Sequence, residues 1–254
     1  MKKIEVKVLN PEDVKQAERM AVCAARLTQR GEKISDMSEF ETLWDKPVYK
    51  SFIRTITELP HPTLQKFAVI NVVIVGASRR FLAQITRHQN EVKFMSASLQ
   101  YSDYSGQGDF VIPYSLMKPE NALAKAIYLD SCREAMANYT AIAGSTGDHD
   151  AAGYAAPQGL RNVLIISATP YQWKHMIAQR TCRRNTDETR YVMLKIWDEL
   201  YKLSPDLFEN AGPFCMNGNC LEGNMSCGKC IDRLMEPADI LAADFPLIYE
   251  EDKE

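Results

Sequence analysis

The apolar run Phe67–Val75 constrains the fold of this chain more than any other segment. Asn71 is its one polar residue, and six of its nine residues are β-branched. Such a composition favours a β-strand that is buried on both faces. A short turn follows, and Ser78 can cap a helix that extends to about Gln89. The sequence therefore predicts a central strand that leads directly into a helix.

The other segments show either helical or extended patterns. Extended patterns occupy residues 3–9, 93–101, 110–112 and 161–167, and helical patterns occupy residues 11–30, 38–44, 48–59, 119–143, 148–156, 170–180 and 186–203. The long helix of residues 119–143 is expected to turn an apolar stripe towards the core, consisting of Leu123, Ile127, Ala135, Met136 and Tyr139. These patterns predict an α+β or α/β fold in which helix predominates.

The composition is that of an ordinary globular protein, with 46% hydrophobic residues among 254. The 30 basic and 33 acidic residues give a net charge of −3, which predicts no global attraction to nucleic acid or to anionic membranes. No apolar run approaches the roughly 20 residues that span a bilayer, and residues 1–8 lack the apolar stretch of a signal peptide. We therefore expect a soluble cytoplasmic protein.

Several motifs that identify enzyme classes are absent from the sequence. It has no glycine-rich dinucleotide loop, no phosphate loop ending in Gly-Lys-Ser/Thr, no His-Glu-x-x-His pair and no Gly-x-Ser-x-Gly elbow. Rossmann-type cofactor binding and P-loop chemistry are therefore disfavoured.

Two polar clusters are candidates for a binding site. Gln84, Arg87 and His88 share one face of the expected helix, so they could present an amide, a fixed cation and an imidazole to a planar anionic ligand. A surface arginine beside a helix-terminal histidine would give the same pattern. The three arginines within residues 180–184 could bind phosphate, or could form a solvated helix junction neutralised by nearby acidic residues.

The chain is expected to divide at about residue 204. Residues 1–204 form one expected domain, and residues 205–254 form a tail rich in cysteine and glycine. Four of the seven cysteines lie in this tail, namely Cys215, Cys220, Cys227 and Cys230. Their spacing is compatible with a tetrahedral zinc site, but also with reduced thiols that bind no metal or with a redox pair. No metal ligand is assigned elsewhere in the chain.

Three blocks of the sequence, taken in order, resemble the flavin-dependent thymidylate synthases. The first block runs from His61-Pro62-Thr63 to Gln84-x-x-Arg87-His88, the second is Ser98-Leu99-Gln100-Tyr101-Ser102, and the third runs from Pro157 to Arg180 and Glu188. No single block is specific, whereas their order and separations together are. The resemblance covers roughly residues 61–203.

This resemblance implies a fold, an assembly and an activity. The fold would be α+β, with helices packed on a small mixed or antiparallel sheet as in the thymidylate synthase-complementing proteins, and residues 1–204 would be the catalytic domain. Active sites would lie at the subunit interfaces of a homotetramer. The family methylates deoxyuridylate (dUMP) to thymidylate (dTMP), with FAD as cofactor and with NADPH and methylenetetrahydrofolate as co-substrates. No membrane or nucleic-acid partner is implied.

The same resemblance assigns roles to individual residues. Arg180 would stabilise the anion that forms when the uracil loses a proton, and Ser98 would lie near the reacting carbons. The nucleotide would contact Gln84, Arg87, Ser96, Gln100 and Arg180, and FAD would contact Thr63, Arg87, His88, Gln89 and His175.

Some positions depart from the family pattern. Gln89, Gln100 and Gly153 stand where arginines are usual, and His175 stands where asparagine is common. Gln100 and Gly153 would each remove a charged contact with the nucleotide, and two losses of about 1.5–3 kcal/mol each would weaken binding unless another arginine substitutes. A related flavin-dependent C5-methylase or hydroxymethylase of another pyrimidine nucleotide is therefore an alternative. A zinc-stabilised nucleic-acid-binding module is a second alternative, motivated by the cysteine tail and the arginine cluster.

Overall fold

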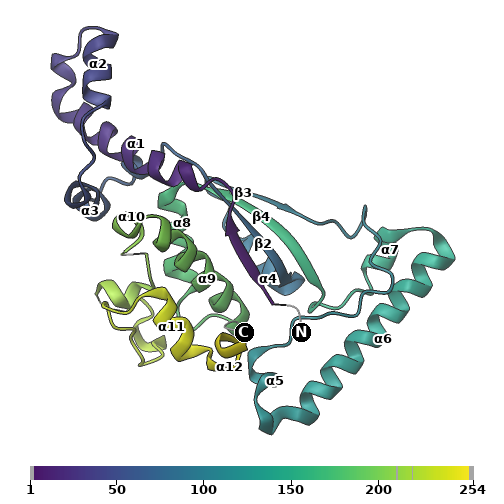
Figure 1. Cartoon of the computed structure of the whole chain (residues 1–254). Coiled ribbons are helices and arrows are strands. Elements are labelled where there is room, and N and C mark those ends of the chain that lie inside the picture. The colour runs from purple at the N-terminus through teal and green to yellow at the C-terminus, as the bar shows by residue number, and fades with distance from the viewer. Residues whose placement is uncertain (1–2, 210, 219, 252–254) are drawn as a thin grey trace.

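A four-stranded sheet with the strand order β1-β2-β4-β3 lies at the centre of the computed structural model, which describes residues 3–209, 211–218 and 220–251. Every neighbouring pair of strands is antiparallel. The strands are β1 (Glu5–Val8), β2 (Ile70–Ser78), β3 (Val92–Ser96) and β4 (Arg161–Ala168). Helices flank this small sheet, which confirms the α+β fold class (Figure 1).

The helices form three groups around the sheet (Figure 1). The first group is α1 (Pro11–Arg30), α2 (Met37–Trp44) and α3 (Lys50–Glu58). The second group is α4 (Arg79–Ile85), α8 (Pro170–Arg180), α9 (Asp187–Leu203), α10 (Pro205–Phe208), α11 (Pro237–Asp244) and α12 (Pro246–Glu251). The third group is α5 (Tyr114–Met117), α6 (Ala122–Thr146) and α7 (His149–Gly153). Short 3-10 turns occur at Gly31–Lys33, Pro62–Gln65, Pro119–Asn121, Phe214–Asn217 and Gly223–Met225. None of the described helices is both long and apolar enough to cross a bilayer.

One face of the sheet packs against α8 and α9. Ile70, Val72 and Ile74 of β2 point to this face and are buried. They belong to one hydrophobic core with residues from both helices. The Trp173 indole of α8 donates a hydrogen bond to the Ile70 carbonyl at 3.0 Å, so α8 is also held to the sheet by a polar contact.

The opposite face of the sheet is partly bare. The expectation that the central strand is buried on both faces is wrong, because β2 alternates between buried and more exposed residues. Val75, Val163 and Ile165 are exposed on this second face, and Met95 is 73% exposed. Successive side chains of a strand point to opposite faces, and the described helices of one chain leave the second face only partly covered.

The α6 helix and its neighbours project from the sheet as an arm (Figure 1). The expected apolar stripe is buried only in its second half, where Met136 and Tyr139 pack into a small separate core. Leu123 and Ile127, which were assigned to the same stripe, are 76% and 60% exposed. The described elements of the same chain leave these two side chains uncovered, so helical periodicity identified an apolar surface without identifying what covers it.

The C-terminal segment packs against α9 rather than extending away from it. Residues 205–251 contain α10, α11 and α12, and Ile240 and Phe245 belong to the main hydrophobic core. Asp244 at the end of α11 accepts hydrogen bonds from Arg183 at 2.9 and 3.1 Å, and another from Arg190 of α9. Burial acts to raise the pKa of Asp244, but the two arginines outweigh it and hold the pKa below its ordinary value.

Replacing Asp244 is expected to destabilise the protein strongly. The side chains of Arg190 and Asp244 are only 6% and 14% exposed, so Asp244→Ala leaves a buried guanidinium unpaired. Breaking a pair of this kind costs about 3 kcal/mol or more. Urea unfolding of Asp244→Ala measures the loss, with Asp130→Ala as the matched control because the Asp130–Arg133 pair is largely exposed. If Asp244→Ala and Asp130→Ala lower the free energy of unfolding equally, the buried Arg190–Asp244 pair does not stabilise the fold as described.

Candidate active site

α4 is fixed at its first turn by Ser78 and Glu188. The Ser78 hydroxyl accepts a hydrogen bond from the Phe81 amide at 3.1 Å and donates one to the Glu188 carboxylate at 2.5 Å. The Ser78 amide donates to the other oxygen of that carboxylate at 2.7 Å. Burial raises the pKa of Glu188, while the bonds from Ser78 act to lower it. Because Glu188 lies in the first turn of α9, these bonds hold α4 and α9 together.

The far ends of α4 and α8 meet beside the sheet. α8 begins where β4 ends, and the Thr169 hydroxyl caps it by accepting a hydrogen bond from the Gln172 amide at 3.3 Å. β3 begins opposite that end, because Val92 pairs with Ala168. The loop of residues 86–91, which joins α4 to β3, therefore lies beside α8. The expectation that this helix extends to about Gln89 is wrong, because α4 ends at Ile85 and Arg87 and His88 lie in the loop.

A cavity of about 340 Å³ lies between this loop and α8. Its walls contain five residues that the sequence assigned to substrate or cofactor binding: Arg87, His88, Gln89, His175 and Arg180. The other lining residues are Asn90, Tyr171, Gln172 and Gln179. The volume is at the lower end of the range for small-ligand sites.

Arg180 is held in place by three acceptors from different segments. Its Nε donates to His88 Nε2 at 2.8 Å, its Nη2 to the Gln84 carbonyl at 3.0 Å and its Nη1 to Asn185 at 3.3 Å. Burial lowers the pKa of the guanidinium, and the neighbouring positive charge of Arg87 lowers it further. A guanidinium has five N–H groups, so donors remain for an anionic or carbonyl-bearing ligand.

His88 is neutral in this setting. Burial lowers its pKa to about 4, and the positive charge of Arg180 and the nearby His175 act in the same direction. Its Nε2 therefore carries a lone pair that accepts the bond from Arg180. The two imidazoles meet edge to face, with ring centroids 5.9 Å apart and an interplanar angle of 83°. Burial also lowers the pKa of His175, so the pair offers aromatic surface without positive charge.

Ser96, Ser98 and Gln100 lie at the opposite end of β3 from the cavity. Ser96 is four positions after Val92, and a strand advances about 3.4 Å per residue, so the two residues lie about 14 Å apart. Ser98 accepts a hydrogen bond from the Gln100 amide at 3.1 Å instead of facing the cavity of its own chain.

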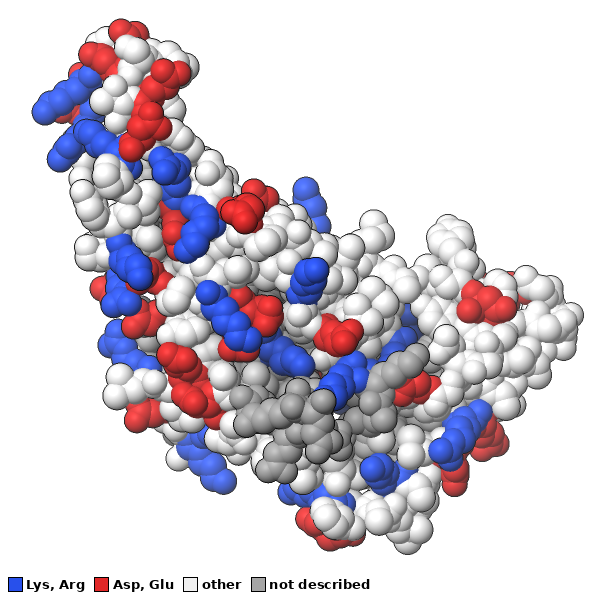
Figure 2. Space-filling model, in the orientation of Figure 1, with Lys and Arg blue, Asp and Glu red and all other residues white. Residues whose placement is uncertain are grey.

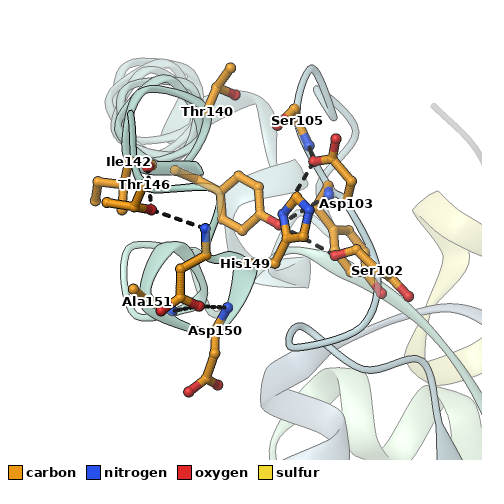
Figure 3. Close-up of polar contacts among 12 residues, drawn as sticks. Ser102, Asp103, Ser105, Thr140, Ile142, Thr146, His149, Asp150 and Ala151 are labelled. Atoms are coloured by element: carbon orange, nitrogen blue, oxygen red, sulfur yellow. Dashed lines mark hydrogen bonds and ion pairs between the residues drawn. The ribbon is translucent and has the colours of Figure 1, made fainter. Parts of the chain in front are cut away.

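The loop that follows Ser98 is held by α6 and α7. Asp103 accepts a bond from the Ser105 amide and lies 3.8 Å from the His149 ring nitrogen (Figure 3). The Tyr104 amide donates to the Tyr139 hydroxyl at 3.1 Å. One chain thus holds two separate groups of assigned residues, one at the cavity and one beside the α6–α7 arm.

Two assigned residues, Gln84 and Thr63, do not line the cavity. Gln84 contributes its carbonyl to Arg180, as described above. Thr63 lies in the turn Pro62–Gln65, next to Lys66, whose ammonium group lies 5.1 Å from the centre of the Tyr171 ring. That contact places the turn close to the first residues of α8.

The lining residues of α8 that the sequence analysis missed had a recognisable signal. Tyr171, His175 and Gln179 are spaced four residues apart and so share one face of a helix. The Thr169 cap and the proline after it fix where that helix begins. Of these three residues, His175 alone was assigned to the site, although Tyr171 and Gln179 follow from the same periodicity. Asn185 had no such signal, because its bond to Arg180 depends on a loop conformation.

His88 is expected to stay neutral well below the usual range of histidine. Long-range ¹H–¹⁵N NMR of the imidazole nitrogens from about pH 7 to about pH 4 measures this, and Arg180→Met should raise the pKa by removing a neighbouring cation. A protonation midpoint near about 6.5 in the native protein would contradict the geometry. Because the unfolded chain takes up this proton first, His88 also makes stability fall as the pH drops from about 6.5 towards about 4.

Comparisons with known proteins place the chain in a family. A family model described as thymidylate synthase complementing protein matches residues 11–206. The flavin-dependent thymidylate synthase of Clostridium tetani is 25% identical over 249 residues, covering 91% of this chain and 96% of the relative. The protein of the same name from Geobacter sulfurreducens is 26% identical over 211 residues, covering 82% and 88%.

Solved structures share the fold. Thymidylate synthase X from Helicobacter pylori, solved with FAD and dUMP, aligns with a TM-score of 0.61 and 17% identity over 82% of this chain and 99% of that one. The UMP/dUMP methylase PolB from Streptomyces cacaoi, bound with 5-Br dUMP, aligns with a TM-score of 0.63 and 16% identity, over 83% and 95%. Because the family model spans most of the sequence, this protein belongs to the thymidylate synthase complementing protein family.

Proposed function

We propose that this protein is a flavin-dependent thymidylate synthase that methylates dUMP to dTMP in the cytoplasm. The observation that carries the proposal is the placement of Arg180 by His88 and Gln84 in a cavity that Arg87 also lines. The named activity of the Clostridium tetani and Geobacter sulfurreducens relatives supports it. NADPH and methylenetetrahydrofolate are the proposed co-substrates.

Arg180 stabilises the negative charge that develops on the pyrimidine when its N3 proton is lost. It cannot act as the base, because a guanidinium does not give up its proton in proteins. Its fixed position means that little reorganisation accompanies the change in charge. Gln84 and Arg87 hold the same nucleotide, and Ser96, Ser98 and Gln100 of another subunit line its other side.

The cavity fits part of an FAD molecule. The neutral rings of His88 and His175 offer surface to a planar heterocycle, and Gln89 offers an amide for hydrogen bonds, with Thr63 nearby. A cavity of about 340 Å³ cannot enclose a dinucleotide together with a pyrimidine nucleotide. When bound, reduced FAD supplies the hydride that converts the transferred one-carbon unit into a methyl group.

A homotetramer would complete the site. Two features of the chain support this assembly: Ser98 and Gln100 lie away from the cavity of their own chain, and apolar side chains remain exposed on β2, β3, β4 and α6. A second copy that covers the bare sheet face would bury these residues. It could also bring its own Ser98 segment to the cavity of the first copy.

A second candidate substrate is another pyrimidine nucleotide. A Cβ atom on Gly153 would lie 3.2 Å from Leu99 Cβ, so the position where the family usually has arginine is packed against its neighbour. Gln100 likewise carries no charge. The likeness to a UMP/dUMP methylase makes uridylate the first alternative to test, in the same assay as dUMP.

The nucleic-acid-binding alternative has less support. On the face shown in Figure 2, basic and acidic side chains are interspersed rather than separated into a basic stripe. The formal net charge of −3 points the same way.

Arg180→Ala is expected to abolish turnover while FAD stays bound. Removing a fixed charge partner costs about 100-fold or more in rate. Tritium release from dUMP labelled at C5 measures turnover, and flavin absorbance after gel filtration measures cofactor retention. Arg30→Ala, an exposed arginine at the end of α1, serves as the control. Unchanged tritium release in Arg180→Ala would defeat the assigned role.

Two inactive variants are expected to restore activity to each other. If one subunit supplies Arg180 and another supplies Ser98, mixing Arg180→Ala with Ser98→Trp, followed by dissociation and reassembly, gives intact composite sites. Random assembly of equal amounts would make about one quarter of the sites intact. Activity that stays at the level of the separate variants would show that both residues come from one chain, or that Ser98 is not part of the site.

A further inference from the structure

Four cysteines of the C-terminal segment lie around one cavity. Cys215, Cys220, Cys227 and Cys230 line a space of about 290 Å³ between this segment and the loop that follows α8. The thiols of Cys215 and Cys230 are in hydrogen-bond contact. All four are free cysteines. The sequence spacing alone does not predict that the four cysteines meet, because 14 residues of mostly irregular chain separate Cys215 from Cys230.

Tight turns bring the thiols to one side. Gly218, Gly223 and Gly228 have φ values of 146°, 50° and 69°, which L-residues with side chains rarely adopt. Gly228 lies inside the Cys227-Gly-Lys-Cys230 turn, where its amide donates to the Ser226 hydroxyl at 3.2 Å. A turn of this kind places two thiols at the spacing found in zinc knuckles.

The cysteine segment has little hydrophobic core of its own. Only 3-10 turns interrupt its irregular backbone, and Met216 and Ile231 are its buried apolar residues in the described part of 214–232. Leu221 is 73% exposed, and Met225 is exposed as well. Small segments that cannot bury enough apolar surface are commonly held by a metal or by disulfides.

The charges around the cavity suit a four-thiolate metal centre. Zn²⁺ bound by four thiolates carries a net charge of −2. Arg183, Arg184 and Lys229 line the same cavity and can offset that charge, against one acidic residue, Glu222. Soft thiolate ligands favour Zn²⁺ over Mg²⁺ or Ca²⁺.

We propose that Cys215, Cys220, Cys227 and Cys230 bind one structural Zn²⁺ in tetrahedral geometry. Within the described residues, no three His, Cys, Asp or Glu side chains already surround a common point, so the ion draws the sulfurs inward to about 2.3 Å. All four cysteines line the same cavity, and metal binding requires their side chains to turn towards a common point within it.

Such a centre would hold the segment against the loop that directly follows Arg180 at the end of α8. Arg183 donates to the Lys229 carbonyl at 2.8 Å and pairs with Asp244, so the cysteine turn is tied to the loop after α8. Gln179 and Arg180 line both this cavity and the candidate active site. The zinc is therefore a positioning element, and its binding does not depend on the proposed reaction.

Metal content of the full chain tests the proposal. The protein is purified under reducing conditions without a polyhistidine tag, and zinc is measured by inductively coupled plasma mass spectrometry. We expect about one zinc per chain, falling at least about fivefold in the double variant Cys227→Ser/Cys230→Ser. Cys182→Ser is the matched control, because its thiol lines the same cavity outside the four-cysteine set, and it should keep the metal.

A second measurement covers the case in which the double variant fails to fold. Co²⁺ substituted into the wild-type chain should give the intense visible bands of a tetrahedral thiolate site, and Zn²⁺ should displace it. Circular dichroism reports whether each variant is folded. Wild-type protein without zinc, equal zinc in the double variant, loss of zinc in Cys182→Ser, or an octahedral Co²⁺ spectrum would each overturn the proposal. So would two disulfides in protein that binds no metal after reduction.

Discussion

The candidate active site depends on one hydrogen bond, from the Arg180 guanidinium to the Nε2 of His88. The bond requires a neutral imidazole, and burial beside Arg180 and a second histidine keeps His88 neutral. The cavity can therefore hold positive charge on Arg180 and Arg87 while its aromatic surface stays uncharged. An anionic pyrimidine nucleotide requires positive charge, whereas a planar cofactor requires uncharged aromatic surface. The cavity offers both.

The sheet makes that bond possible by bringing distant segments together. The antiparallel pairing of β3 with β4 places the start of α8 beside the loop after α4, and Ser78 and Glu188 fix where α4 begins. The same pairing places Ser98 at the other end of β3. One chain therefore holds two separate groups of the residues assigned to the site, and apolar side chains are exposed on the second face of the sheet.

Local rules predicted much of the fold and part of the site. The central strand and the Ser78 cap follow from composition and local pattern, because those signals act over a few residues. The shared helical face of Gln84, Arg87 and His88 was wrong, because α4 ends at Ile85 and Arg87 and His88 lie in the loop that follows. Periodicity failed for Leu123 and Ile127, since it shows that a surface is apolar and not which surface covers it. The partners of Arg180 and the distance of Ser98 from the cavity depend on tertiary contacts, which no local pattern encodes.

A crystal structure of the assembled protein with FAD and dUMP tests this account most directly. We expect the uracil to contact Arg180 and Arg87 of one subunit and Ser98 of another, with the flavin against His88 and His175. A nucleotide bound away from Arg180, or a Ser98 segment on the outer surface of every assembly, would contradict it.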